Sequence, residues 1–225
     1  MISVVISTLD SEEALAHCLT ALVPAAAEGI VREVLVVDGG SRDATRTVAD
    51  AAGCDLEEVS GSDGARFAAG SRMARKSPWL LFLPAGSMLE SGWHAEAANF
   101  IERTEHSGQA ERCAAVFRLK QDAFGFGARA GEALGNLTTQ VFGMPASEQG
   151  LLISRRFYVS LGGHHDLAAL SDLDIARRIG RGRLILLRSA AVIPQAPARP
   201  ARQKLARFAV TALRLPPRLV RALHG

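Results

Sequence analysis

Short apolar runs alternate with helix-like stretches over the first 90 residues of this chain. Three stretches begin helices near Ser11, Ser41 and Ala65, and the first is expected to end near Pro24. They separate four apolar runs that we predict to be strands: Ile2–Ser7, Val31–Val37, Cys54–Val59 and Trp79–Leu83. Strands that alternate with helices in this order favour a parallel sheet with helices on both faces. We therefore expect an α/β fold.

The alternation is less regular after residue 90. Helices are expected over Glu90–His106, Arg156–Leu161 and Ser171–Ile179. Strands are expected over Cys113–Leu119, Gln149–Ser154 and Leu184–Leu187. The glycine-rich span Phe124–Met144 gives no clear pattern and is left unassigned.

Charge divides the chain into two parts, although its total is only +3. Every acidic residue lies at or before Asp174, so the first 174 residues hold 14 basic and 23 acidic residues and carry −9. The remaining 51 residues hold twelve Arg or Lys and no acid. We expect an acidic globular domain over residues 1–194 and a basic tail over residues 195–225.

The composition excludes several classes of protein. With 48% hydrophobic and 22% charged residues, the chain suits a folded protein rather than a disordered one. The longest uncharged run, Ala133–Ser147, is too short and polar to span a bilayer, and no signal peptide is recognised. Three separated cysteines exclude a zinc knuckle and a complete disulfide framework. We expect a cytoplasmic location.

Ligands of open parallel sheets bind beyond the carboxyl ends of the strands. This rule selects four loops, over residues 7–12, 38–43, 60–66 and 84–90. Carboxylates there can accept pairs of hydrogen bonds from a base or a ribose. Asp10 and Asp43 equally suit helix caps. Capping explains Asp38 less well, because Asp38 precedes two glycines that permit close approach of a ligand.

Several motifs occur in an order that is found in a known family. They are Ser3–Thr8 with Asp10 and Glu12, Val34–Thr45, Gly64–Arg66, Trp79–Leu83, Gly92–Trp93, Glu148–Gly150, Leu161–Gly163 and Ser171–Asp174. Over about residues 2 to 190, this series resembles the family-2 glycosyltransferases of the GT-A fold. The resemblance implies a Rossmann-like, mostly parallel sheet flanked by helices, here followed by a basic C-terminal helical tail. It also implies transfer of a sugar from a nucleotide diphosphate to an acceptor hydroxyl, with inversion.

The resemblance implies a donor site at three loops. Thr8, Asp10 and Glu12 fall where the family holds the nucleotide. Asp38, followed by Gly39, falls where a carboxylate usually meets the base. Arg66 lies in the loop that approaches the ribose or the diphosphate.

The resemblance also implies a catalytic base and an acceptor region. Asp172 falls on the acidic position that deprotonates the acceptor hydroxyl, and Gln149, Gly162 and Gly163 fall near the acceptor. Asp172 equally suits the first turn of a helix, where the macrodipole favours an acid.

One departure from the family concerns metal binding. After the fourth strand the family carries Asp-x-Asp, which binds Mg²⁺ or Mn²⁺, but this chain has Leu83–Ser87 without a carboxylate. No metal ligand is therefore predicted, and Arg66, Arg72 or the basic tail would have to meet the diphosphate. The alternative is a catalytically silent GT-A protein that serves as a binding or scaffold partner.

Two further features leave alternatives open. Adjacent His164 and His165 point in opposite directions in an extended chain, so a polar loop is favoured over a shared metal. In the tail, an apolar stripe at helical spacing suits packing on the domain or contact with an anionic membrane: Leu205, Phe208, Ala209, Ala212 and Leu213. Membrane contact would suit a lipid-linked or polysaccharide acceptor at the inner face of the membrane. Nucleic-acid binding is not expected, because no recognition module is present.

Overall fold

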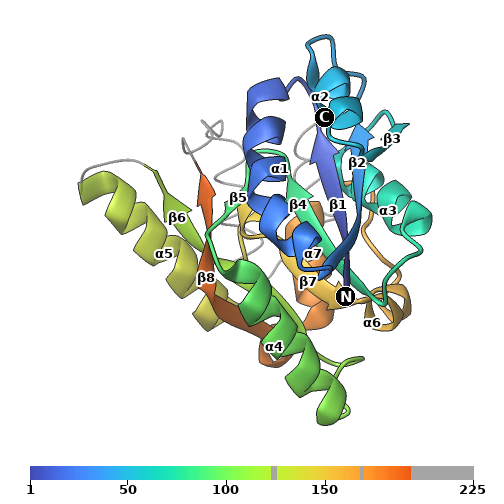
Figure 1. Ribbon diagram of the computed structural model, residues 1–225. Helices are drawn as coiled ribbons and strands as arrows, with labels where there is room; N and C mark the ends of the chain where they lie inside the picture. Colours follow the sequence, from blue (N-terminus) through green and yellow to red (C-terminus); the bar gives the residue numbers. More distant parts are fainter. Residues whose placement is uncertain (123–125, 168–169, 194–225) are drawn as a thin grey trace.

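The computed structural model of the protein describes residues 1–122, 126–167 and 170–193 (Figure 1). In these parts of the chain, the strands form one sheet in the order β3-β2-β1-β4-β7-β6-β8-β5. Their bounds are β1 Ile2–Thr8, β2 Val31–Asp38, β3 Asp55–Glu58, β4 Trp79–Pro84, β5 Met88–Leu89, β6 Ala114–Gln121, β7 Leu151–Ser154 and β8 Leu184–Ile193. The predicted α/β fold is confirmed.

Helices cover both faces of this sheet. Their bounds are α1 Glu12–Ala27, α2 Thr45–Ala51, α3 Asp63–Met73, α4 Trp93–His106, α5 Phe126–Phe142, α6 Arg155–Ser160 and α7 Ser171–Ile179. Two short 3-10 helices, η1 (Ser147–Gln149) and η2 (Arg181–Arg183), precede β7 and β8. Figure 1 shows α5 at the outer edge of the molecule, beside β6 and β8.

The first four strands form the parallel half of the sheet, as the alternation predicts. β1 lies between β2 and β4 and runs parallel to both, and β3 extends the parallel pairing beyond β2. Their carboxyl ends therefore meet at one edge, where Thr8 of β1 lies opposite Asp38 of β2. The second half is mixed, because β7 runs antiparallel to β4 and β6, whereas β6 and β8 are parallel.

The alternating side chains of β1 divide the interior into two hydrophobic cores. Ile2, Val4 and Ile6 pack with α1 and α4 on one face of the sheet. Val5 belongs to the other core, which α3, α6 and α7 cover. Figure 1 shows α1 and α4 in front of the sheet and α7 behind it. Because every residue of β1 is buried, its apolar sequence suits a central strand covered on both faces.

Two helices differ from their predicted bounds. α1 continues past Pro24 to Ala27, because Ala25 is wholly buried and core packing offsets the hydrogen bond that proline removes. α2 begins at Thr45 rather than Ser41, because Ser41 belongs to a turn held by the Asp38 carboxylate.

Two segments of the second half also differ. The unassigned span contains α5, whose packing against β6 the local sequence does not reveal. β8 extends to Ile193 rather than stopping at Leu187. Its pairing with β6 shifts between Val116 and Arg118, and the backbone N–H groups of Arg188 and Ser189 donate to the Glu96 carboxylate instead.

The predicted tail over residues 195–225 lies outside the described residues. Within the ranges that the structure describes, no helix is both long enough and apolar enough to cross a membrane.

Candidate functional site

The loops after β1 and β2 are joined by the carboxylates that the sequence singles out. Asp10 Oδ1 accepts a hydrogen bond from the Arg42 N–H at 2.8 Å, and Glu12 Oε2 accepts one from the Ala44 N–H at 2.9 Å. Asp43 accepts in return from the Glu12 N–H at 3.1 Å. Asp10 has a left-handed backbone with φ of 45°, which aspartate tolerates better than most residues. These carboxylates shape the edge of the sheet by holding its loops together.

Asp38 is fully buried at the end of β2. Its Oδ2 accepts hydrogen bonds from the N–H groups of Gly40 at 3.0 Å and Ser41 at 2.8 Å, and its Oδ1 accepts from the Ser41 hydroxyl. The carboxylate is therefore buried within its own loop in this geometry, and its contact with a base stays a prediction. Asp38 caps its own loop in this structure, although its sequence position before two glycines favoured that role less.

Arg66 is buried at this edge of the sheet and donates hydrogen bonds to three groups. Its Nε donates to Ser7 Oγ at 2.7 Å, its Nη1 to the Gly61 carbonyl at 2.8 Å, and its Nη2 to Asp63 Oδ1 at 2.7 Å. The Ser7 hydroxyl also donates to Asp63 Oδ1 at 2.6 Å. Arg66 is thus a buried cation whose charge is paired with Asp63.

The structure brings Thr8, Gly39 and Arg66 together. A Cβ added to Gly39 would lie 2.7 Å from Arg66 Nη1, so this glycine lets the loop after β2 rest against the guanidinium. The Thr8 hydroxyl is buried and has no hydrogen-bond partner within the part of the chain that the structure describes. Arg72, the alternative cation, lies in the last turn of α3, ~14 Å along the helix axis from Asp63. Arg72 is therefore remote from this edge of the sheet.

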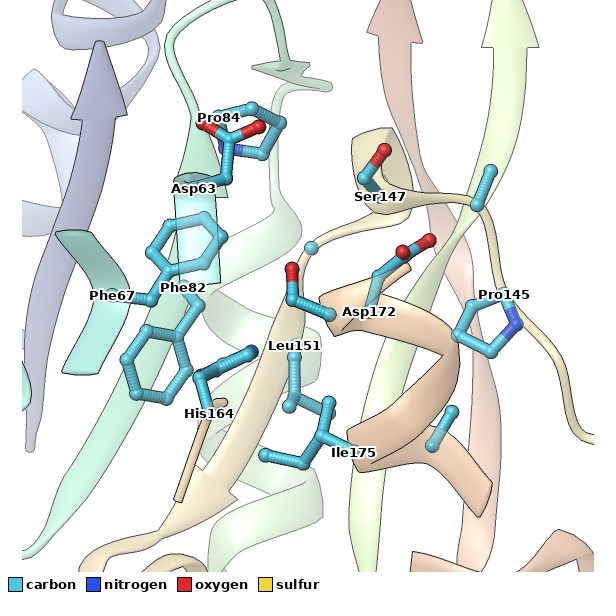
Figure 2. Close-up of a pocket in the computed structure, with 14 residues that line it drawn as sticks. Asp63, Phe67, Phe82, Pro84, Pro145, Ser147, Leu151, His164, Asp172 and Ile175 are labelled. Carbon is cyan, nitrogen blue, oxygen red and sulfur yellow. The ribbon is translucent and has the colours of Figure 1, made fainter. Parts of the chain in front are cut away.

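A pocket opens beside this edge, between α3 and α7. Asp63 lines it from the start of α3, and Pro84 lines it from the end of β4. Asp172 and Ile175 line it from α7. Figure 2 shows Asp63 beside Pro84 and Asp172 on the other side of the pocket. Asp172 is half-buried in the first turn of α7. The pocket therefore places the predicted catalytic carboxylate near the carboxyl end of β4.

An aromatic layer forms the bottom of the pocket. Phe67 and Phe82 meet edge to face with ring centroids 5.4 Å apart, and His164 lies against both rings. His164 Nδ1 lies 3.0 Å from the Tyr158 hydroxyl, which also accepts the His164 N–H at 2.9 Å. Burial, with a smaller contribution from Arg178, lowers the pKa of His164 to about 3. His164 is thus neutral at physiological pH and presents no positive charge to the pocket.

His165 points elsewhere, toward a buried ion pair. Its Nδ1 lies 2.6 Å from Asp174 Oδ2, and Arg178 Nη2 donates to the same oxygen at 2.6 Å. Because His164 and His165 occupy different surroundings, they do not converge on one ligand. Among the described residues, no group of three or more His, Cys, Asp or Glu side chains is placed to hold a metal.

The expected acceptor residues lie away from the pocket surface. Gln149 is fully buried, its Oε1 accepts from the Thr139 hydroxyl and the Ala146 N–H, and its Nε2 donates to the Phe117 carbonyl. Gln149 therefore joins α5, η1 and β6 in this geometry, and its contact with an acceptor stays a prediction. Gly162 and Gly163 end α6 with positive φ, and Gly163 packs against the Tyr158 ring.

Asp63 lines the pocket but is not among the residues predicted from the sequence. Its signal was present, because residue 63 lies in the loop over residues 60–66 that the strand-end rule selects. Ser62 caps α3 by accepting the Ala65 N–H at 3.3 Å, and the helix start then aims Asp63 at the pocket. The ion pair between Asp63 and Arg66 is not predictable from the sequence.

The segment after β4 does not fit a divalent metal. It consists of Pro84, Ala85, Gly86 and Ser87, which offer no carboxylate. The Ser87 hydroxyl is fully buried and donates to the Glu148 carbonyl at 2.9 Å. Mg²⁺ and Mn²⁺ require several oxygen ligands, and the side chains of this segment supply none that is available.

The half-parallel sheet, with its edge loops and a pocket that holds an acid from a later helix, defines a GT-A glycosyltransferase fold. Residues 3–108 match the model of glycosyl transferase family 2, the family that the motifs resemble. A search of curated proteins finds no match.

Solved structures with this fold include three relatives of different specificity. Residues 1–349 of TarS from S. aureus match with a TM-score of 0.65 and 15% identity, over 97% of this chain and 68% of that one. Glucosyl-3-phosphoglycerate synthase from Mycobacterium tuberculosis, with Mn²⁺, UDP and glucosyl-3-phosphoglycerate, matches at 0.62 and 19%, over 94% and 77%. The mannosyltransferase PcManGT from Pyrobaculum calidifontis, with GDP-Man and Mn²⁺, matches at 0.68 and 15%, over 100% and 64%. At these identities the likeness shows the fold.

Proposed function

We propose that this protein binds a nucleotide-diphosphate sugar and transfers the sugar to an acceptor hydroxyl, with Asp172 as the general base. The observation that carries the proposal is the position of Asp172 in the pocket between α3 and α7, beside Pro84 at the end of β4. The family assignment of residues 3–108 supports it. So do two structural relatives, which were solved in complex with UDP and with GDP-Man.

The pocket suits a displacement at the anomeric carbon. The Asp172 carboxylate takes the acceptor hydroxyl proton while the oxygen forms its bond to that carbon. The bond from the carbon to the phosphate oxygen breaks on the opposite side, and the nucleoside diphosphate leaves. Attack and departure on opposite faces invert the anomeric configuration. Phe67 and Phe82 would provide an apolar wall for the ring of the sugar.

The nucleotide would lie along the edge formed by Thr8, Gly39 and Arg66. The loops that carry Asp10 and Glu12 bound this edge, and their carboxylates act by holding the loops. We propose that the Thr8 hydroxyl, which is buried and without a partner within the described residues, gains one when a nucleotide displaces the neighbouring loop.

A second candidate is a silent protein of the same fold that binds a nucleotide or a partner without transferring sugar. A specific observation favours it, namely the scarcity of positive charge near the leaving group. Arg66 is paired with Asp63, His164 is neutral, and no Lys or Arg lines the pocket within the described ranges. A diphosphate leaves with negative charge that something must stabilise.

Calorimetry with a panel of UDP-, GDP- and TDP-sugars, with and without Mn²⁺, tests donor binding. We expect one donor to bind, with the nucleoside diphosphate alone retaining part of the affinity. Failure of every donor to bind would remove the nucleotide-sugar proposal. We expect the acceptor to be lipid-linked or a polysaccharide, so the turnover assays should include acceptors of both kinds.

Turnover separates the two candidates. With the donor that binds, Asp172→Asn should lower transfer or donor hydrolysis by about 10²–10⁴ while donor affinity changes little. Asp50→Asn, at an exposed site on α2, is the matched control and should keep full activity. Turnover that survives Asp172→Asn would exclude the base assignment, and binding without turnover in the unaltered protein would favour the silent candidate.

A further inference from the structure

The inner side of α5 is polar, which is unusual for a helix that packs on a sheet. Glu132 Oε1 accepts the Gln121 N–H at 2.7 Å, and Asn136 pairs with the backbone of Leu119 through hydrogen bonds of 2.8 and 3.0 Å. Gly135 lies so close to Leu119 that an added Cβ would be 2.8 Å from its Cδ2. Polar and small residues therefore attach α5 to β6.

The outer side of α5 is apolar and exposed. Leu134, Leu137 and Val141 follow the i, i+3, i+7 spacing of one helix face, and they are 65%, 54% and 37% exposed. Phe142, at the end of the helix, is 50% exposed. We call these four residues the α5 stripe. Among the helices in the described ranges, no other carries as many exposed large hydrophobic residues. This face therefore suits a partner that covers it.

The chain leaves the described residues next to this helix. Ile193, the last residue of β8, lies opposite Gln121, and its carbonyl accepts the Asp122 N–H at 2.9 Å. The Gln121 N–H in turn donates to Glu132 of α5. Eleven residues lie between Ile193 and Leu205, and this linker can reach up to ~40 Å when extended. A helix is only ~10 Å across, so this linker can carry the chain around α5 to its outer side.

The sequence beyond that linker has a matching pattern. Leu205, Phe208, Ala209, Ala212 and Leu213 recur at helical spacing and form what we call the tail stripe. We propose that the tail stripe packs against the α5 stripe of the same chain. Arg202, Arg207 and Arg214, which flank the tail stripe, then lie at the rim, toward an acidic domain whose first 174 residues carry −9.

A membrane fits this face less well. Helices that lie on anionic membranes carry Lys or Arg on the polar side that faces the headgroups. α5 carries a single basic residue, Arg129 in its first turns, and the polar residues Glu132 and Asn136 are turned toward the sheet.

A second copy of the chain is also less suited. Four exposed side chains fall short of the roughly 800 Å² per partner that a stable dimer buries. A tethered segment needs less surface, because the linker holds it at an effective concentration in the millimolar range.

The docked tail would also support the pocket. Thr139 on the inner side of α5 donates to Gln149 Oε1, and the same oxygen accepts the Ala146 N–H in the pocket wall. Covering the outer side of α5 would therefore steady a wall of the proposed active site.

Thiol labelling in the full chain tests the contact. The probe is Leu137→Cys, labelled with a maleimide at neutral pH, alone and combined with Phe208→Asp and Leu213→Asp. Burial raises the pKa of Cys18 to about 12 and that of Cys54 to about 11, so these native thiols react slowly. We expect labelling at position 137 to be at least tenfold slower when the tail stripe is intact.

The matched control is Val159→Cys, because Val159 is a 67% exposed apolar residue of α6, remote from the α5 stripe. It should label at the same fast rate with either tail. Equal rates at position 137 with the intact and altered tails would overturn the proposal, whether both are fast or both are slow.

Two further arms identify another occupant. Protection that appears only with phosphatidylcholine–phosphatidylglycerol vesicles would assign the α5 stripe to a membrane and refute docking of the tail. A bis-maleimide should join Leu137→Cys and Ala209→Cys within one chain. Cross-links only between chains, with protection that rises with protein concentration, would assign the face to a second copy. Neither readout depends on donor binding, so the proposed function can fail independently.

Discussion

Gly64 is the position where the contact between α3 and α7 is most sensitive to a single added carbon. A Cβ at this residue would lie 2.1 Å from the backbone carbonyl oxygen of His165 and 2.7 Å from Ser171 Cβ. Ordinary carbon–oxygen contacts are about 3.3 Å or longer, so the two segments would have to separate by about 1 Å. We therefore expect Gly64→Ala to push α7 away from α3.

The size of the effect follows from two opposing contributions. Overpacking costs typically about 1–3 kcal/mol, and a clash with backbone lies at the upper end because no side chain can rotate away. Alanine in place of glycine gains about 1 kcal/mol of helix propensity at this position in α3. A net loss of about 2 kcal/mol should lower Tm by about 4–8 °C in a protein of this size.

Thermal unfolding followed by circular dichroism measures this shift. Gly182→Ala is the matched control, since an added Cβ there meets nothing within 4 Å, and its Tm should not fall. Because Asp63 and Asp172 line the pocket from α3 and α7, Gly64→Ala should also lower turnover with the donor that binds. A Gly64→Ala protein that melts at or above the Tm of the unaltered protein would refute the close approach of the two helices.

Two other predictions concern buried polar groups. Burial holds the pKa of His164 at about 3 in the folded protein, against 6.5 in the unfolded chain. The contribution of His164 to the free energy of unfolding is therefore constant above pH 6.5. It declines below pH 6.5, because the unfolded chain binds a proton that the folded protein does not. At pH 5 the loss should be about 2 kcal/mol in urea unfolding, and His164→Phe should remove this slope; an unchanged slope in that variant would contradict the burial of a neutral imidazole. Gln149→Leu should cost about 3 kcal/mol or more, because the partners on Phe117, Thr139 and Ala146 lose their hydrogen bonds, with little effect on acceptor KM once the protein is folded. A raised KM with unchanged stability would restore Gln149 to the acceptor site.

The first half of the fold follows from local sequence. Apolar runs such as Ile2–Ser7 and Val31–Val37 can only be buried on both faces, and the helices between them make parallel pairing with crossovers the natural arrangement. The edge at which the candidate site lies then follows from the strand direction. The family assignment rests on the same segments, since the matching residues 3–108 include all four strands of the parallel half.

The second half depends on contacts that local pattern does not encode. α5 attaches to β6 through polar groups and glycines, so its hydrophobic pattern points outward and misleads an interpretation from periodicity. β8 continues past Arg188 because Glu96 of α4, 92 residues away in sequence, accepts the backbone N–H that the β6 pairing leaves out. Such distant partners are invisible until the chain is folded.

The sequence by itself determined which loops meet at the ligand-binding edge and which residue types they carry. Tertiary structure decided what each carboxylate does there. Asp38 is used up by its own turn, and Asp10 accepts an N–H from a loop 32 residues away. Asp63 pairs with Arg66, and both Asp63 and Asp172 line the pocket. The physical reason is that a carboxylate contacts a ligand only when folding leaves its oxygens accessible, and hydrogen bonds between distant segments decide that accessibility.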